Sequence, residues 1–407
     1  MAEPFQFRGV NMNSNEPIFR EKYNVIVVGG GIAGVAASVS ASRMGAKTLL
    51  LEKGVNLGGL ATEGLISWYE PLCDGKGTQM ISSIAEELIK LSFRYGFDNL
   101  PRNWGGEGSN ESKNERYSTY YSPTVFALAL DEFVVSNNVK ILFDTLATFP
   151  VMKGNHCEGV IVENADGRIR YDADVVIDAT GNATVMSRAG VPTHIGENYM
   201  TYIAHYYDME MAKDLVSDRN TCKFRKWVNA GSDMQGNGHP EGMGMLSGIK
   251  ADDISAYILS GKAAMLKRIK NMDRNSFDIM ALPTMAQFRT IRRIQGECDF
   301  CAEDGRQFED SIGSCGDFRM NFVGKRYNVP YSSLYNKNFD NLLAAGRIIS
   351  SPQGNGWEVA RVIPTCALTG EAAGTAAALA IQSNCSVCDV NIKKLQQALK
   401  NNGVIFN

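Results

Sequence analysis

Apolar runs that end in glycine recur along the chain, and each predicts a buried parallel strand. The clearest is Asn24–Val28, a β-branched run followed directly by glycines. Runs without polar alternation are typical of strands that are buried on both faces. The next stretch, Ile32–Met44, is rich in Ala, Ser and Gly and predicts a helix packed closely on a sheet, and Lys47–Glu52 predicts a second strand. Together these elements form one βαβ unit of about 30 residues.

The same patterns predict further elements toward the C-terminus. Helices are predicted at Met80–Tyr95, Ser122–Asn137, Thr365–Ile381 and Ile392–Lys400. Strands are predicted at Lys140–Phe143, Gly159–Glu163, Arg168–Tyr171, Asp174–Asp178 and Asn341–Gly346. Because Asp166-Gly167 is a typical tight-turn pair, it predicts a hairpin between the second and third of these strands.

A change of composition divides the chain. Between about Val191 and Pro330, Met, Tyr, Asn and Arg are scattered through mixed helical and strand patterns, unlike the glycine-punctuated runs on either side. We therefore predict an N-terminal arm at 1–22, a first α/β part at 23–190, an inserted mixed α+β domain at 191–330, and a second α/β part with a C-terminal helix at 331–407. A length of 407 residues accommodates two such domains.

Composition narrows the classes of partner. Apolar residues make up 44% and charged residues 21%, which is typical of a globular protein. The net charge of −3 gives no basis for a nucleic-acid-binding face, which needs clustered basic residues. No apolar run approaches the roughly 20 residues that span a bilayer, and the first 23 residues lack the apolar segment of a secretory signal. We therefore expect a cytoplasmic protein that binds neither nucleic acid nor membrane.

The cysteines give a weak signal for a metal. Cys298 with Cys301 and Cys385 with Cys388 have C-x-x-C spacing, and four thiolates could surround zinc or an iron–sulfur cluster. The two pairs lie in segments of different character, and none of the 4 histidines has metal-motif spacing. We therefore favour unrelated thiols and expect no metal site. The 9 cysteines cannot all be paired, so we expect no disulfide framework.

Residues 29–34 satisfy the pattern G-x-G-x-x-G between a predicted strand and a predicted helix, which is the context of a dinucleotide-binding loop. Gly29 permits the tight turn, Gly31 lets the backbone approach a pyrophosphate, and Gly34 allows the helix to pack on the strand. The phosphates would bind free N–H groups at the helix N-terminus. Glu52 ends the second strand, where a carboxylate can accept hydrogen bonds from ribose hydroxyls. The context argues against a purely structural glycine turn.

Further glycine turns favour FAD over NAD. A second glycine loop, Lys53–Thr62, follows the ribose-binding acid, and an NAD-binding domain has no general need for it. Asp178–Gly181 and Gly346-Arg347 supply two more strand-end turns. Converging strand-end turns suit a long ligand that lies across the carboxyl ends of a parallel sheet. The sequence therefore predicts FAD.

The helix predicted at Thr365–Ile381 begins after Arg361-Val362-Ile363-Pro364, with Pro364 preset for its first turn. Its free N–H groups and partial positive charge would stabilise the negative charge of reduced flavin. Many helices that begin with proline contact no ligand, so the residues alone leave this role open.

These segments, in this order, resemble a family of bacterial FAD-dependent oxidoreductases of the glutathione-reductase-like FAD superfold. The matching segments are 27–34, 58–62, 177–182, 289, 292–297, 329–334, 341–347 and 361–378. The resemblance covers most of residues 24–400. It implies an α/β fold in which a discontinuous Rossmann-like FAD-binding domain carries an inserted mixed α+β substrate domain. It does not fix the substrate, because such families carry out varied chemistry on one scaffold.

The resemblance also implies where the cofactor lies. The pyrophosphate would lie on the first glycine loop, the adenosine ribose on Glu52 and the adenine beside Ala147. The ribityl–pyrophosphate stretch would lie beside Gly346, and residues 361–363 would border the flavin ring. The candidate cofactor-binding residues are Gly29, Gly31, Ile32, Ala33, Gly34, Glu52, Lys53, Gly58, Gly59, Leu60, Ala61, Thr62, Ala147, Ala179, Thr180, Gly181, Gly346, Arg347, Arg361, Val362 and Ile363.

A single dinucleotide fingerprint constrains the reaction. No second one occurs, and only Cys73 follows the first glycine loop where a disulfide reductase carries a redox pair, so that class is disfavoured. We favour a dehydrogenase or reductase that passes hydride between flavin N5 and a small organic substrate. A monooxygenase or oxidase that uses oxygen and a flavin-bound electron-transfer protein remain alternatives, and RNA modification is disfavoured by the acidic charge balance. The oligomeric state stays open, a homo-oligomer included.

Three side chains are candidates for the chemistry. Arg289 and Arg361 could clamp a substrate carboxylate and fix a carbon against the flavin. Ordinary salt bridges with acids such as Glu297 are the alternative. Glu358 could accept a proton if burial raised its pKa, and a satisfied surface carboxylate is the alternative there. Trp68, Tyr69 and Tyr331 are further candidate pocket residues.

Overall fold

The computed structural model describes residues 16–108, 116–218, 225–233 and 235–406. Within these residues the largest sheet has seven strands, and its centre is parallel. The parallel strands lie in the order β5 (Lys140–Leu142), β2 (Thr48–Leu51), β1 (Ile18–Val28), β8 (Gly167–Asp178) and β16 (Leu342–Ala344). The predicted α/β class with a Rossmann-like sheet is confirmed.

The parallel strands end in register, and this places their following loops together. Val28 pairs with Leu51 on one side and with Asp178 on the other, and Asp178 pairs with Ala344. The glycine-rich segments that follow these residues therefore meet along one sheet edge, where open α/β sheets bind their ligands.

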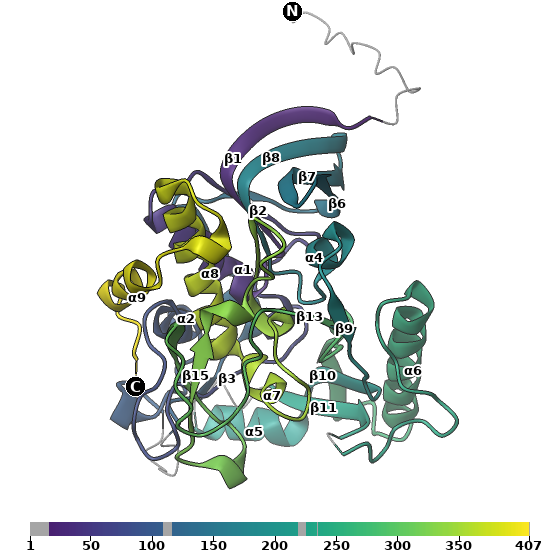
Figure 1. The fold of residues 1–407 in the computed structure, drawn as a ribbon. Coiled ribbons are helices and arrows are strands. Elements are labelled where there is room, and N and C mark those ends of the chain that lie inside the picture. Colours follow the sequence, from purple (N-terminus) through teal and green to yellow (C-terminus); the bar gives the residue numbers. More distant parts are fainter. Residues whose placement is uncertain (1–15, 109–115, 219–224, 234, 407) are drawn as a thin grey trace, which may run out of the picture.

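The far edge of β8 is shared by two partners. Its first half pairs antiparallel with β7 (His156–Asn164), which pairs in turn with β6 (Leu146–Lys153), and its last three residues pair with β16. Figure 1 shows β1, β8, β7 and β6 together at one end of the molecule. The predicted hairpin is confirmed, since Asn164 pairs with Gly167 across the turn. β6 was not predicted from the sequence, because its polar and apolar residues follow no regular alternation and include Pro150.

The prediction of an arm at 1–22 is corrected for its last residues. β1 begins at Ile18, which pairs with Ile169 of β8, and the pairing continues through Lys22. These residues are exposed and three of the five are charged, so they lack the continuous apolar signal of a buried strand, and pairing with the extended β8 orders them. Residues 1–15 lie outside the described residues.

Two helices of small residues cross at very short distance. They are α1 (Ile32–Arg43) and α8 (Ile363–Ser383), which lie side by side against the sheet (Figure 1). A Cβ at Gly370 would lie 2.2 Å from the Ala33 carbonyl oxygen, and one at Gly374 would lie 2.2 Å from that of Ala37. Only glycine permits this approach, and it brings the N-terminus of α8 to the start of α1.

The other predicted helices are confirmed at their places. These are α2 (Ile84–Phe93), α3 (Pro123–Ser136) and α9 (Ile392–Asn401). A short helix, α4 (Thr184–Ala189), follows β8. One hydrophobic core joins α1, α2, α3 and α8 to one face of the sheet, and a second covers its other face beneath the β6–β8 meander.

The inserted region begins with a sheet of its own. β10 (Thr201–Asp208) pairs antiparallel with β11 (Lys226–Gly231) and with β12 (Phe277–Ala281). The helices of this region are α5 (Met209–Asp218) and α6 (Ala251–Ile269). A third hydrophobic cluster, whose members all lie between Met200 and Ile291, packs this sheet against α6. The chain enters and leaves the region through two paired strands, β9 (Thr193–Ile195) and β13 (Arg292–Ile294).

The chain returns to the first core earlier than residue 331, where the sequence predicts its return. The hairpin of β14 (Ser311–Gly316) and β15 (Arg326–Pro330) buries Ile312, Cys315 and Tyr327 in the core shared with α1 and α8. It belongs there because β14 packs directly on α8 and α9. The predicted boundary therefore cuts off a hairpin that packs with the second α/β part.

Candidate active site

The first glycine loop makes the tight turn that its spacing predicts. Gly29 has φ +103°, in the left-handed region that favours glycine. α1 follows at Ile32, and the first N–H groups of a helix have no partner within it. A Cβ at Gly34 would lie 1.8 Å from the Gly29 carbonyl oxygen, so only glycine lets the helix begin this close to the strand. The helix N-terminus therefore lies directly on the sheet edge.

Open space lies beside this helix N-terminus. A Cβ built at Gly31 would meet nothing within 4 Å, although the neighbouring positions Gly29 and Gly34 are closely packed. N–H groups and the helix dipole favour an anion at such a place. The first glycine loop therefore fits a diphosphate.

Glu52 is fixed between the two glycine loops. Its Oε2 accepts a hydrogen bond from Gly30 N at 2.6 Å, and its Oε1 accepts one from Gly54 N at 2.7 Å. The residue is 8% exposed. Because each carboxylate oxygen has a further lone pair, the acid can still accept hydrogen bonds from ribose hydroxyls.

The second glycine loop lies directly on the first. Gly58 N donates to Gly30 O at 2.8 Å, and a β-bridge joins Gly31 to Gly58. The turn then continues as a short 3₁₀ helix, Gly59–Ala61. The two loops form one backbone surface at the sheet edge.

Two hollows join into a single groove along this edge. One is lined by both glycine loops, by 179–181 and by 345–347. The other is lined by 145–149, at the start of β6, and by the ends of β1 and β2. Both hollows are lined by Gly29, Glu52, Lys53 and Thr180, so they are contiguous. We refer to them together as the groove, and its extended form suits a long ligand.

Arg347 ties the far wall of the groove to the inserted region. Its Nε donates to Gly181 O at 2.6 Å, and its Nη1 donates to Phe288 O at 2.5 Å. Burial lowers the pKa of Arg347 to about 10. Among the described residues its partners are carbonyl groups rather than acids, so its positive charge is not neutralised by the protein.

A further hollow, which we call the chamber, adjoins the groove and has a volume of about 250 Å³. Both are lined by Leu60, Ala61, Arg361 and Ile363. The chamber is walled by β3 (Trp68–Tyr69), by β10 and β11 of the inserted region, and by the segment before α8. Its other lining residues are Ile66, Trp68, Glu70, Thr201, Ile203, Trp227, Gln287, Arg289, Phe318 and Val362.

The structure brings nearly all the candidate cofactor-binding residues together. Those lining the groove are Gly29, Gly31, Ile32, Ala33, Glu52, Lys53, Gly58, Gly59, Leu60, Ala61, Ala147, Ala179, Thr180, Gly181, Gly346, Arg347, Arg361 and Ile363. Val362 lines the chamber instead. Gly34 and Thr62 line neither hollow: Gly34 packs against Gly29, and the Thr62 hydroxyl donates to Leu57 O at 2.5 Å. These two support the loops from behind.

The candidate catalytic residues do not all meet. Arg289 and Arg361 both line the chamber. Glu358 lies on the short helix α7 (Trp357–Ala360) and lines neither the groove nor the chamber, and it accepts a hydrogen bond from Gly354 N at 2.8 Å. Of the candidate aromatic residues, Trp68 lines the chamber, whereas Tyr69 and Tyr331 are fully buried in the core.

Several chamber residues were not predicted from the sequence. Glu70, Trp227 and Phe318 come from three distant segments, and none stands beside a glycine turn or in a motif. The insertion of β10 and β11 opposite the α8 N-terminus is what gathers them. No local signal could have shown this, because it depends on how two parts of the chain pack.

Burial perturbs the charged groups of the chamber. It lowers the pKa of Arg361 to about 10, assisted by the nearby positive charge of Arg289, and it lowers the pKa of Arg289. The Arg361 guanidinium lies 5.1 Å from the Trp357 ring and 5.6 Å from the Phe318 ring. Burial also raises the pKa of Glu70, although a Trp68 hydrogen bond and the charge of Arg116 oppose the shift. A raised pKa favours the proton-bearing form of this acid.

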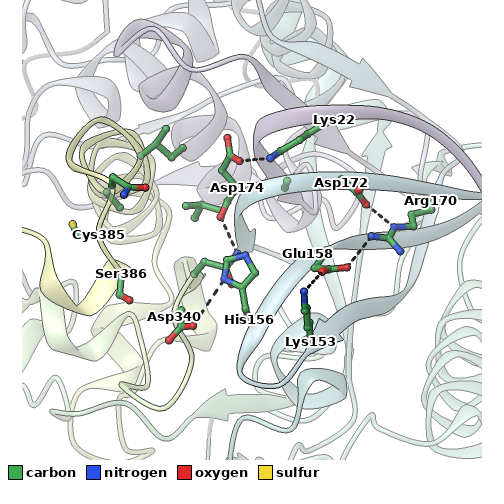
Figure 2. Close-up of a pocket in the computed structure, with 16 residues that line it drawn as sticks. Lys22, Lys153, His156, Glu158, Arg170, Asp172, Asp174, Asp340, Cys385 and Ser386 are labelled. Atoms are coloured by element: carbon green, nitrogen blue, oxygen red, sulfur yellow. Dashed lines mark hydrogen bonds and ion pairs between the residues drawn. The ribbon is translucent and has the colours of Figure 1, made fainter.

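A separate charged hollow lies beside the amino-terminal half of β8. Figure 2 shows its charged residues paired with one another: Lys22 with Asp174 at 2.7 Å, and Arg170 with Asp172 and Glu158 at 2.6 and 3.0 Å. His156 faces Asp340 at 4.0 Å, next to Cys385 and Ser386. This hollow contains none of the candidate site residues, and it lies away from the carboxyl ends of the strands.

Neither a metal site nor a membrane-spanning helix is found among the described residues. No three His, Cys, Asp or Glu side chains among them come together as metal ligands. None of the helices formed by these residues combines the length and the apolar character needed to cross a membrane.

A family comparison matches most of the chain. The model of a family described as FAD dependent oxidoreductase matches residues 24–203 and 255–399. The gap between the two matched parts falls within the inserted region.

Individual relatives match over shorter stretches. A tRNA uridine 5-carboxymethylaminomethyl modification enzyme of Lactococcus lactis subsp. cremoris is 59% identical over 39 residues, 10% of this chain and 6% of that protein. A vinyl phenol reductase of Lactiplantibacillus plantarum is 49% identical over 77 residues, 18% of this chain and 15% of that protein. The chain thus spans only a small part of these curated relatives. A geranylgeranyl bacteriochlorophyll reductase-like protein of Thermoplasma acidophilum has a solved structure that aligns with a TM-score of 0.47 at 15% identity, covering 94% of this chain and 83% of that one.

Proposed function

This chain belongs to the FAD dependent oxidoreductase family, and from that premise we propose that it transfers hydride between flavin N5 and a small organic substrate held in the chamber. Its cofactor is FAD, and it is an enzyme. We also propose that the groove is the FAD site and that the chamber is the substrate site.

The residues of the groove have the chemistry that FAD needs. The α1 N-terminus and the open space at Gly31 would hold the diphosphate, and Glu52 would hold the adenosine ribose. The hollow that includes Ala147 would take the adenine. The α8 N-terminus and Arg361 would border the flavin ring, where positive charge stabilises the reduced form.

One observation carries the proposal. The chamber and the groove are both lined by Leu60, Ala61, Arg361 and Ile363, so a substrate in the chamber would lie next to the end of the groove. When bound, FAD supplies a two-electron carrier. The chain itself binds the substrate in the chamber that Trp68 and Trp227 line, and places the acid Glu70 within the same space.

The experiment begins from the yellow holoprotein. Under anaerobic conditions it is mixed with carboxylate, amine and alcohol donors, and, after chemical reduction, with unsaturated acceptors. We expect a substrate that bleaches or reoxidises the flavin, with a deuterium isotope effect when the transferred hydrogen is labelled. A reduced flavin that reacts only with oxygen would favour an oxidase or monooxygenase. One that reacts only with a redox protein would favour an electron-transfer protein.

Matched variants test the chamber. Ile203→Trp fills it, because Ile203 lines the chamber and is 6% exposed. We expect this variant to keep its flavin and to lose reaction with substrate. Val216→Trp is the control, since Val216 is 77% exposed on α5. Equal substrate reaction in the two variants would contradict the placement of the substrate.

The relatives give little information about the substrate of this chain. The vinyl phenol reductase, by its name, supports a reductive reaction. The tRNA modification enzyme shares only 39 aligned residues with this chain, too short a stretch to extend its substrate here.

A further inference from the structure

The polar groups of the chamber divide into those that have partners and those that do not. The Gln287 amide donates to Gly64 O and Ile203 O and accepts from Ile203 N. Trp227 Nε1 donates to Ser67 Oγ at 3.1 Å, and the Thr201 hydroxyl donates to Ser232 O at 2.9 Å. Within the described residues, these side chains have no donor left for a ligand.

The two arginines differ from this pattern. Arg361 is half-buried, and its buried Nε has no hydrogen-bond partner among the described residues. Arg289 is also half-buried, and the only hydrogen bond that it donates to a described residue is from its backbone N, to Asn198. Among the described residues, neither guanidinium forms an ion pair. Buried charges without a counter-charge are costly, so each leaves a site for an anion.

Three nearby anions could be thought to neutralise these arginines. The charge of Glu358 acts on Arg361, but Glu358 lines neither the groove nor the chamber. FAD would lie in the groove, which Arg361 lines, but Arg289 lines only the chamber. Glu70 also lies in the chamber, but the positive charges that act on it are those of Arg116 and then Arg361, rather than that of Arg289. The charge of Arg289 therefore remains for the substrate.

The rest of the chamber is apolar and aromatic. Trp68, Trp227 and Phe318 line it together with Ile66 and Ile203. Flat apolar groups stack well between such rings. A chamber lined by two guanidinium groups and by aromatic and aliphatic side chains suits a ligand with one anionic group on an apolar body.

We propose that the chamber selects a carboxylate-bearing substrate with a planar apolar body, and that Arg289, together with Arg361, binds its carboxylate. This rests on the proposed function, which it deepens by naming the substrate class. A fork of N–H groups matches the two oxygens of a carboxylate, and the positive charges disfavour amines. The acid Glu70 then lies in the same chamber as the bound substrate.

The test measures binding to the oxidised holoprotein, without turnover. The probes are cinnamate, benzoate and crotonate, each compared with its uncharged amide. Binding is followed by tryptophan fluorescence, since Trp68 and Trp227 line the chamber, and by calorimetry. We expect at least one acid to bind about 10- to 100-fold more tightly than its amide, as for a charge-assisted hydrogen-bonded pair.

Three variants separate the specific contact from general charge. Arg289→Gln should bind acid and amide with affinities within about 3-fold of each other, whereas Arg289→Lys, which keeps the charge but loses the fork, should be intermediate. Arg293→Gln is the matched control, because Arg293 lies outside the chamber and faces Asp299 at 3.6 Å. It should keep the full preference.

The results that would overturn the carboxylate inference differ from those that would overturn the proposed function. A colourless protein would refute the FAD site. A yellow protein that binds each acid no better than its amide, or binds none of them, would overturn the carboxylate inference alone. A preference that survives in Arg289→Gln would overturn the role of Arg289. The wild-type comparison of acid with amide holds even if a variant does not fold.

Discussion

Replacing Gly31 by valine should remove FAD and leave the fold intact. Gly31 has φ −64° and ψ 176°, an extended conformation that any residue adopts, and a Cβ there meets nothing within 4 Å. The folded chain should therefore tolerate the side chain, with a change in unfolding free energy of about 0.5 kcal/mol or less. The same side chain would occupy the space in which we place the diphosphate.

The magnitude follows from the contacts that would be lost. A diphosphate displaced from the α1 N-terminus loses about two charge-assisted hydrogen bonds of roughly 1.5–3 kcal/mol each. The total of about 3–6 kcal/mol corresponds to a loss of roughly 10²- to 10⁴-fold in FAD affinity. Purified Gly31→Val should therefore be colourless, and its apoprotein should bind FAD weakly.

The assay compares three variants of matched size or position. FAD affinity is measured by titrating the apoprotein, and stability by thermal unfolding of the apoprotein. Gly244→Val is the control, since Gly244 is exposed, also has open space and lies outside the groove. Gly34→Ala should instead destabilise the apoprotein, because its Cβ would lie 1.8 Å from the Gly29 carbonyl oxygen. If Gly31→Val binds FAD as the wild type does, the diphosphate does not lie at this loop.

Three further expectations concern stability and proton transfer. Burial raises the pKa of Glu371 to about 7 from its ordinary 4.5, so between these pH values the folded chain holds a proton that the unfolded chain has released. The free energy of unfolding should therefore fall by about 3 kcal/mol as pH rises across this window. Denaturant unfolding of Glu371→Gln should show no such dependence on pH. Gly374→Ala would place a Cβ 2.2 Å from the Ala37 carbonyl oxygen, and we expect it to lower unfolding free energy by about 1–3 kcal/mol and to weaken FAD binding, measured by the same titrations. If Glu70 donates a proton, the rate of substrate reduction should fall as pH rises through its raised pKa, and Glu70→Gln should lower kcat more than it changes KM and remove that limb of the pH profile.

Much of the groove could be predicted because its parts are local. A strand, a glycine turn and a helix follow one another within a few residues, so Gly29, Gly34 and Glu52 carry their own context. The regular spacing of parallel strands then places successive strand-end turns at one edge, which is why Gly181 and Gly346 also line the groove.

The chamber could be predicted only in part. Arg289 and Arg361 were predicted as candidate catalytic residues, and both line the chamber. Glu358 was predicted as a third candidate from its place in the sequence, but it lies on α7 outside the chamber and accepts a hydrogen bond from Gly354 N. A position close in sequence to a site is no guide to the direction of a side chain on a short helix.

The sequence by itself determined the βαβ unit and the FAD-type succession of glycine turns, because each turn and its flanking strand and helix are formed by residues near one another in the chain. Only the tertiary structure decided which side chains face the end of the groove. That depends on the crossing of α1 and α8 at Gly370 and Gly374 and on the packing of the inserted sheet against β3. Contacts between segments more than a hundred residues apart, such as Glu70 and Arg361 in one chamber, leave no periodic pattern in the sequence, because they are set by how the two cores pack together.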